Sequence, residues 1–379
     1  MDTTVTETLI ELATRLAAVS SHEDETAAGD EIEAWLCAET DADVRRDEVG
    51  NVIARNGAGE RSLALVGHHD VVAPADEQVT DDGNYIVEAC DGRLYGRGTA
   101  DMKGAVAAAM LAFRDIDVAG TSSERTSSDD ASLPGELVFA SFVGEEVGGV
   151  GARHAIDEGF SPDYAIVGEG STGYSSPGVT DVAVAHKGRR GSTITAHGSA
   201  AHASEPDAGE NAIYRATDAV SLIRTLEAPT VEVAGESLEG SVVVTEIDGG
   251  TAMNVVPDRC DVTVDERTVP GERAAIERLE DLEGVEWTVD QDLPPMRCGD
   301  EAFAGGVLQT ADSVQSGSPE FVTKPHATDA GWLAAAGTEC VICGPAEPGE
   351  AHTADESVSV AVLERCYRIY RGAAENWLG

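Results

Sequence analysis

Four short apolar segments of the chain are each followed by His, Asp or Glu, and this pattern limits the folds that the chain can adopt. Uncharged runs of this length, rich in Val, Leu and Phe, predict strands buried in a sheet. Because ligand sites in open α/β sheets lie at the carboxyl ends of strands, we expect the polar residues after these runs to meet at one edge. They are His68, His69 and Asp70, then Asp101, then Glu145 and Glu146, and finally Glu169.

Helical and strand patterns alternate along the first half of the chain. We expect helices at 4–18, 25–38 and 102–116, and strands in NVIARN, LALVG, LVFASFVG and YAIVG. Alternation of this kind predicts an α/β fold. The segment 119–136 between the last helix and the next strand has almost no apolar content, which predicts a surface loop.

The length of 379 residues favours two domains. Beyond about residue 181 the pattern changes to alternating strands around one helix at 211–226. We therefore predict a smaller α+β domain at 181–291 inserted into the first domain, which has a mixed sheet and comprises 1–180 and 292–379.

The chain is extremely acidic, with 25 Lys and Arg against 70 Asp and Glu and a formal net charge of −45. Nucleic acids and anionic membranes are recognised by clustered cations, so this balance argues against both as partners. The composition is typical of a halophilic protein, from the cytoplasm of an organism that accumulates salt. The acidic N-terminus resembles neither a signal peptide nor a membrane span, and we expect a cytoplasmic protein.

The seven cysteines are scattered along the chain and predict reduced thiols rather than a disulfide framework. Cys340 and Cys343 have the spacing of a redox pair. No helix pattern opens behind them, so we expect them to pack in the core.

The polar residues after the apolar runs suit a metal centre. Imidazole and carboxylates without thiolates favour Zn²⁺, or the related Co²⁺ or Mn²⁺. In HHD, the spacing of His68 and Asp70 places both side chains on one side of an extended chain, so that Asp70 could fix the imidazole tautomer. His69 would point the other way and be structural. Any single acid among 70 could instead be a turn or surface residue.

The chain resembles the M20 family of co-catalytic zinc amidohydrolases, which includes desuccinylases, deacetylases, aminoacylases and peptidases. The resemblance rests on GHHDVV, YGRGTADMKG, GEEVGGVGA, VGEGS, GSAAHASEPDAGENAI, GGTAMNVVPD and GEAHTADE, in that order and over nearly the whole chain. It implies a zinc-hydrolase catalytic domain carrying an inserted lid and dimerisation domain.

The resemblance also assigns site residues. It implies two divalent metal ions, zinc first among them, with Asp101 bridging. The metal ligands would be His68, Asp101 and Glu169 for one ion, and Asp101, Glu146 and His352 for the other. Glu145 would be the general base that takes a proton from a metal-bound water and delivers it to the leaving amine.

Further assignments implied by the resemblance fall in the inserted domain. His202 would stabilise the tetrahedral oxyanion in the active site of the partner in a homodimer. Arg267 and Asn254 would hold the substrate carboxylate, with Arg190 a further candidate. His186 and His197 match no motif, and we expect them to be structural.

The resemblance favours removal of a succinyl or acetyl group from an N-acylated amino acid, with carboxypeptidase or dipeptidase action as the alternative. The segment GVGARH, with Glu169 twenty residues beyond Gly149, also resembles a dinucleotide-binding fingerprint, which would indicate an NAD-dependent oxidoreductase. His154 at its third glycine position argues against that interpretation. A second alternative is a protein that binds metal without catalysis. Glu145 argues against it, because the metal ions do not require this residue. The family usually has a small residue where His69 stands.

Overall fold

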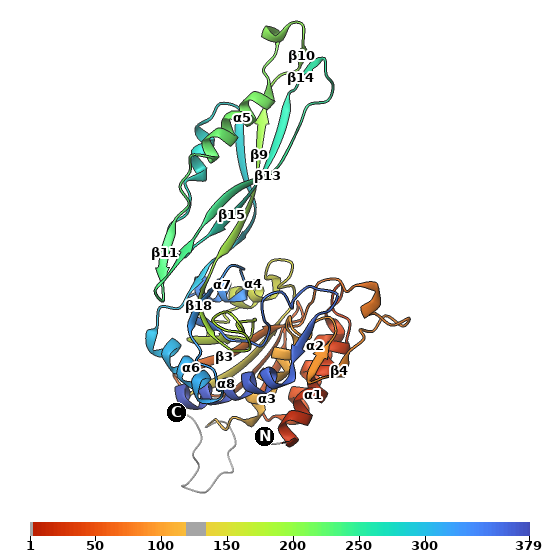
Figure 1. Ribbon diagram of the computed structural model, residues 1–379, viewed down its shortest axis with the longest axis vertical. Coiled ribbons are helices and arrows are strands. Elements are labelled where there is room, and N and C mark those ends of the chain that lie inside the picture. The colour runs from red at the N-terminus through yellow and green to blue at the C-terminus, as the bar shows by residue number, and fades with distance from the viewer. Residues whose placement is uncertain (1–2, 119–133) are drawn as a thin grey trace. The chain divides into compact units, whose positions relative to one another are not determined.

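The computed structural model describes residues 3–118 and 134–379, so that most of the predicted loop at 119–136 lies outside the described residues. The chain divides into two compact units (Figure 1). The first unit comprises Met1–Ala185, Arg297–Lys324 and Thr328–Gly379, and the second comprises His186–Met296 and Pro325–Ala327.

A nine-stranded mixed sheet forms the centre of the first unit in the described part of the chain. Its strands lie in the order β1 (Asp43–Arg46), β2 (Val52–Gly57), β6 (Glu136–Phe142), β3 (Ser62–His68), β7 (Tyr164–Val167), β19 (Glu339–Ile342), β8 (Val182–His186) and β17 (Met296–Arg297), and β18 (Phe321–Lys324) pairs with β8. β6, β3, β7 and β19 are parallel neighbours, whereas β2 runs antiparallel to β6 and β8 runs antiparallel to β19. The carboxyl ends of the four parallel strands therefore share one edge.

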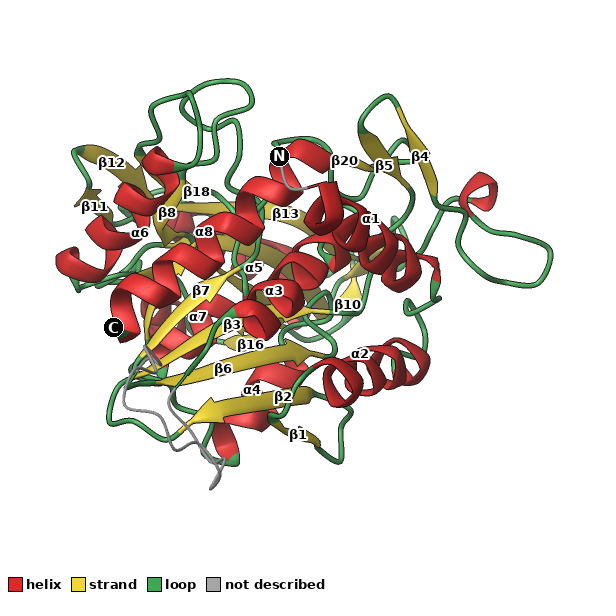
Figure 2. Cartoon of the chain, turned by 90° about the horizontal axis from the view of Figure 1, so that it is seen from below, coloured by secondary structure: helices red, strands yellow, loops and turns green. Residues whose placement is uncertain are grey.

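Helices cover both faces of this sheet, as Figure 2 shows. One face carries α1 (Thr3–Ala18), α2 (Thr26–Glu39), α3 (Lys103–Asp115), α6 (Glu301–Ser313) and α8 (Val360–Leu378), and the other carries α4 (Val150–Asp157) and α7 (Asp329–Ala335). Cover on both faces explains why the strand sequences are continuous apolar runs, because a strand covered on both sides has no position that faces solvent. From Leu137 to Phe142 every residue of β6 is buried. The Ala-rich α3 is likewise buried over most of its length.

A separate three-stranded sheet is formed by β4 (Glu88–Cys90), β5 (Arg93–Tyr95) and β20 (Ser357–Ser359), in the spatial order β20-β5-β4. The prediction that an apolar strand of the central sheet leads directly to Asp101 is wrong. β5 ends at Tyr95, and the chain then turns through Gly96 and Gly98, whose φ angles of 144° and 80° suit glycine. Asp101 lies two residues before Lys103, the first residue of α3.

The second unit is built around an antiparallel four-stranded sheet in the order β13 (Ser241–Gly249), β15 (Arg259–Thr268), β9 (Gly188–His197) and β16 (Val285–Leu293). α5 (Ala212–Ile223) packs on it with Ala212, Ala216, Ala219 and Ile223, which share one helical face. The Asn211 side chain caps α5 by accepting a hydrogen bond of 2.9 Å from the backbone N–H of Ile213. Two further strand pairs are β11 (Thr230–Val233) with β12 (Glu236–Glu239), and β10 (Ala201–His202) with β14 (Val255–Val256).

Three short 3₁₀ helices, Asp76–Gln78, Pro206–Ala208 and Ile276–Asp281, complete the elements of the described residues. The predicted fold class, a mixed α/β sheet with an inserted smaller α+β part, is confirmed. No helix in residues 3–118 or 134–379 has the length and apolar character needed to cross a membrane. Cys340 and Cys343 are buried and unbridged, and burial raises the pKa of both thiols well above the usual range.

The charge of −45 predicts that salt stabilises the folded chain. Raising KCl from about 0.1 M to about 1 M shortens the Debye length from about 10 Å to about 3 Å, so that repulsion among surface acids is screened. We expect the Tm measured by circular dichroism to rise by several degrees over this range. A variant with exposed acids replaced by their amides should show a smaller rise, and a Tm independent of KCl would contradict the prediction.

Candidate metal centre

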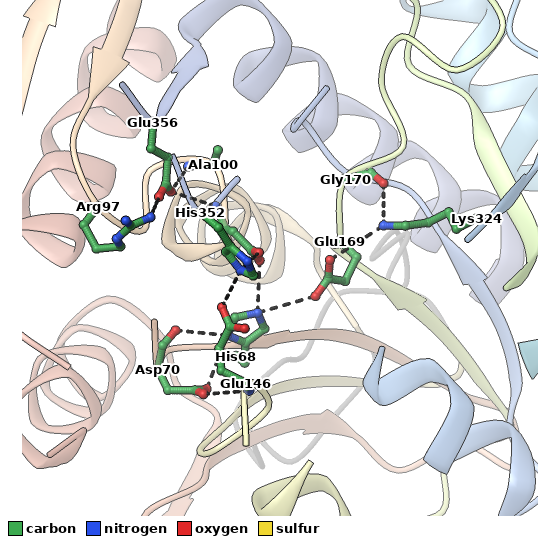
Figure 3. Close-up of polar contacts among 11 residues, drawn as sticks. His68, Asp70, Arg97, Ala100, Glu146, Glu169, Gly170, Lys324, His352 and Glu356 are labelled. Carbon is green, nitrogen blue, oxygen red and sulfur yellow. Dashed lines mark hydrogen bonds and ion pairs between the residues drawn. The ribbon is translucent and has the colours of Figure 1, made fainter. Parts of the chain in front are cut away.

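His68 is the last residue of β3 and is almost fully buried. Its Nε2 lies 3.2 Å from Asp101 Oδ1 and 3.4 Å from Glu169 Oε1. Figure 3 shows His68 and Glu169 converging from separate segments. Glu169 lies two residues beyond the end of β7, which is the parallel neighbour of β3. The sheet thus delivers both residues to one edge, as the sequence predicts.

Asp70 supports this arrangement in two ways. His68 Nδ1 lies 3.1 Å from the backbone oxygen of Asp70 and 3.3 Å from its Oδ1, which leaves Nε2 facing Asp101. Asp70 Oδ2 accepts a hydrogen bond of 3.0 Å from the backbone N–H of Glu146. Burial opposes ionisation of Asp70, but the interactions with His68 and the Glu146 N–H lower its pKa below the ordinary value. The second contact was not predicted, because it joins two segments far apart in sequence.

Two groups of ligand atoms could each hold a metal ion. The first group is His68, Asp101 and Glu169, and the second is Asp101, Glu146 and His352. Within each group the ligand atoms lie within 4.8 Å of one another, and Asp101 belongs to both. The structure therefore brings together all five residues predicted to bind metal.

His352 contacts the two carboxylates of the second group. Its Nε2 lies 2.9 Å from Glu146 Oε1 and 3.0 Å from Asp101 Oδ2. These hydrogen bonds, to Asp101 first and then to Glu146, raise the pKa of His352 to about 10. For His68, burial opposes the charged form, but hydrogen bonds to Asp101 and Asp70 outweigh burial and raise its pKa well above the ordinary value. The carboxylates around both imidazoles therefore create a negative potential that favours bound positive charge.

The donor set fits two divalent cations. Nitrogen and oxygen donors without thiolates suit Zn²⁺, Co²⁺ and Mn²⁺. When all four are ionised, Asp101, Glu145, Glu146 and Glu169 carry four negative charges, which two divalent ions would balance. Asp101 remains ionised despite burial, since hydrogen bonds to His352 and His68 lower its pKa.

Glu145 stands beside Glu146 but belongs to neither group of ligands. Burial raises its pKa well above the ordinary value; the charge of His68 opposes this shift, and the negative charges of Glu169, Asp329 and Asp101 add to it. Burial and the neighbouring acids therefore favour the protonated form of Glu145. The adjacent glutamates thus differ in surroundings, which explains why one segment carries both.

Two charged residues at the centre were not predicted from the sequence. Lys324, at the end of β18, is buried and donates a hydrogen bond of 2.6 Å to the backbone oxygen of Gly170, with its Nζ 3.7 Å from Glu169 Oε2 (Figure 3). Asp329 begins α7, and neither carboxylate oxygen has a hydrogen-bond partner in the described residues. Burial raises the pKa of Asp329 to about 7. The sequence pattern of the short strand that ends in Lys324 could have indicated this residue. Nothing in the segment TDAG, however, indicates that Asp329 is buried.

His69 takes no part in either group of ligands. It is fully buried, and its Nδ1 lies 2.9 Å from Ser141 Oγ on the neighbouring strand β6. Burial lowers the pKa of His69 to about 3, so the ring stays neutral. Its role as a packing residue accords with these contacts.

The predicted oxyanion and substrate residues all belong to the second unit. His202 is exposed, and its Nδ1 lies 2.7 Å from Ser204 Oγ. Asn254 is exposed, and its backbone oxygen accepts a hydrogen bond from Ala203.

The two predicted arginines differ in their freedom to bind a ligand. Arg267 is partly exposed and lies 2.8 Å from Asp265. Arg190 is 8% exposed, forms an ion pair with Glu266 and lies over the ring of Trp287 at 5.1 Å. Arg190 is therefore already held by its own sheet.

The position of Glu169 argues against the dinucleotide-binding interpretation. Gly149 does cap the start of α4. Glu169, however, the residue that would bind a ribose, lies 3.4 Å from His68 in the first ligand group. It would have to leave the carboxylate cluster to take that role.

Comparison with known proteins gives a consistent result. A model of peptidase family M20/M25/M40 matches residues 64–376. An acetylornithine deacetylase from Myxococcus xanthus is 31% identical over 358 residues, covering 89% of this chain and 86% of the relative. A succinyl-diaminopimelate desuccinylase from Stenotrophomonas maltophilia (strain R551-3) is 30% identical over 353 residues, covering 88% and 89%.

Among solved structures, the aminopeptidase PepT from Bacillus cereus ATCC 10987 superposes with a TM-score of 0.76. The two sequences are 20% identical, and the match covers 98% of each chain. At this identity the likeness concerns the fold.

The contacts of Asp70 generate a prediction about metal affinity. Asp70→Asn removes the charge that orients His68, and we expect the affinity for Zn²⁺ to fall about 10–100-fold in calorimetric titration of the metal-free protein. Asp163→Asn is the matched control, because Asp163 also accepts a backbone hydrogen bond, from Ser62 at 2.8 Å, but is exposed and outside the metal centre. Equal affinity in both variants would contradict the assigned role of Asp70.

Proposed function

The chain belongs to peptidase family M20/M25/M40, and from this premise we propose that it removes a succinyl or acetyl group from an N-acylated amino acid by metal-dependent amide hydrolysis. The observation that carries the proposal is the pair of ligand groups sharing Asp101, with Glu145 beside them. The deacylase branch is favoured by the two relatives at 30% identity or more, each covering most of both chains.

His68, Asp101 and Glu169 would hold one divalent ion, and Asp101, Glu146 and His352 the other. When bound, two such ions, zinc first among the candidates, lower the pKa of a water and polarise the amide carbonyl. The chain's own contribution is to fix the ligands, and Asp70 and Lys324 contribute to this by contacting His68 and Glu169.

Glu145 would carry the proton during hydrolysis. It would accept a proton from the attacking water and donate it to the nitrogen of the leaving amine. Burial and the neighbouring acids raise its pKa, which favours holding the proton between these two transfers. Its place beside a ligand, but outside both ligand groups, leaves its carboxylate available for this role.

The second unit would supply the groups that bind substrate. With Nδ1 of His202 placed at Ser204 Oγ, Nε2 is the ring nitrogen that could donate to a tetrahedral oxyanion. Arg267 and Asn254 would hold the substrate carboxylate. Arg190 is a weaker candidate for this role, because Glu266 already pairs with it.

We further propose a homodimer formed through the second unit. β13 is the edge strand of its sheet, and Val243 and Ile247 on this strand are 51% and 56% exposed. An edge strand with exposed apolar side chains is suited to pairing with another copy. In such a dimer His202 would act on the active site of the partner.

The role of Glu145 predicts a separation of catalysis from metal binding. Glu145→Gln should lower kcat by a factor of about 10²–10⁴ through loss of proton transfer, while the chain still binds two divalent ions. Glu146→Gln should instead weaken binding of one ion, because Glu146 is a ligand. Metal content by elemental analysis and kcat for the same samples check both statements. Near-normal turnover by Glu145→Gln with metals bound would contradict the assignment.

The trans action of His202 can be tested by mixing two inactive variants. His202→Ala and Glu145→Ala are each expected to be inactive. After subunit exchange, a mixed dimer would contain one site with an intact Glu145 and the partner's intact His202, so activity should return to about a quarter of the wild-type value. No recovery in mixtures shown to exchange subunits would contradict trans action.

The function itself is tested by hydrolysis in molar KCl of N-succinyl-diaminopimelate, N-acetylornithine and several dipeptides, before and after chelation. Chelator-sensitive release of succinate or acetate is the expected result. Cleavage of dipeptides alone would place the chain with the peptidases of the family. Hydrolysis that survives complete metal removal would contradict the metal-dependent mechanism.

A further inference from the structure

The second ligand group depends on two chain segments that pair with each other. β20 runs antiparallel to β5, with Ser357 opposite Tyr95 and Ser359 opposite Arg93. The pairing continues where the Gly96 N–H donates a hydrogen bond of 2.9 Å to the backbone oxygen of Glu356. One segment leads to Asp101, and the other follows His352.

Glu356 links these segments through its side chain as well. It is 1% exposed, and its Oε1 accepts hydrogen bonds from the backbone N–H groups of Ala100, at 3.0 Å, and Asp101, at 3.2 Å. Its Oε2 pairs with the guanidinium of Arg97, which is also buried (Figure 3). Glu356, four residues after the candidate ligand His352, thus holds the backbone of the candidate ligand Asp101.

A second ion pair lies on the other side of His352. Glu350 pairs with Arg93, which also donates hydrogen bonds to Ser357 Oγ at 3.0 Å and to the Ser357 backbone oxygen at 3.1 Å. His352 therefore lies in the sequence between Glu350 and Glu356. Each of these glutamates pairs with an arginine of the segment that leads to Asp101. The Arg93–Glu350 pair is the more exposed of the two, so Arg97–Glu356 is the better shielded link.

We propose that Glu356, held by Arg97, is a positioning residue for the second metal: it fixes Asp101 relative to His352 and thereby sets the affinity of that site separately from the first. The inference rests on the proposed function, which assigns metals to both groups. The asymmetry follows from the fold. Two of the three ligands of the second group, Asp101 and His352, come from the paired segments. In the first group only the shared Asp101 depends on this pairing, because His68 and Glu169 come from strands of the central sheet.

The test is a calorimetric titration of the metal-free full chain with Zn²⁺, comparing wild type with Glu356→Ala and the nearly isosteric Glu356→Gln. We expect the Kd of one ion, that of the second group, to rise about 10–100-fold in Glu356→Ala, while the Kd of the other ion changes much less. Arg97→Lys, which keeps a cation beside Glu356, should lie between wild type and Glu356→Ala. Glu364→Gln is the matched control, because Glu364 is also buried and paired, with Arg368, but lies on α8.

A second readout does not require metal. Hydrogen exchange of the amides of Ala100 and Asp101 in the metal-free protein should accelerate in Glu356→Ala and stay unchanged in Glu364→Gln, because only Glu356 accepts from these groups. Unchanged exchange and unchanged Kd values in folded Glu356 variants would overturn the proposal alone, since the wild type would still bind two ions. An equal loss at both sites would also overturn it. Wild type that binds no divalent ion would overturn the proposed function, and the inference with it.

Discussion

Repulsion among carboxylates gathered at one edge of the central sheet is the constraint on which the rest of the structure depends. β3, β6 and β7 are buried and parallel, so their ends are fixed and the acids that follow them cannot move apart freely. Three of these acids are held by specific partners: Asp70 by His68 and the Glu146 N–H, Glu169 by Lys324, and Asp101 by the two imidazoles. The negative charge that remains suits the edge to hold divalent cations.

The apolar runs made much of this centre predictable from the sequence. A run such as LVFASFVG can be buried on both faces only in a covered sheet, and the ends of parallel strands then coincide. The pattern therefore predicted the convergence of His68, Glu146 and Glu169 at one edge. It did not predict how Asp101 arrives there, because β5 is only three residues long and the path to α3 is set by glycine turns.

The contacts of Glu356 and Lys324 could not be predicted, because each joins distant parts of the chain. Glu356 and Asp101 are 255 positions apart, and Lys324 and Gly170 are 154 apart. Periodicity carries no information about such pairs. In the second unit the same limit applies to Arg190, whose partner Glu266 is set by the register between β9 and β15.

The central claim is that two divalent ions share Asp101. Anomalous diffraction recorded at the zinc edge, on crystals of the chain grown with Zn²⁺, tests this claim most directly. The account predicts two anomalous peaks per chain, one bounded by His68, Asp101 and Glu169 and the other by Asp101, Glu146 and His352. A single peak, or peaks at other residues only, would contradict it.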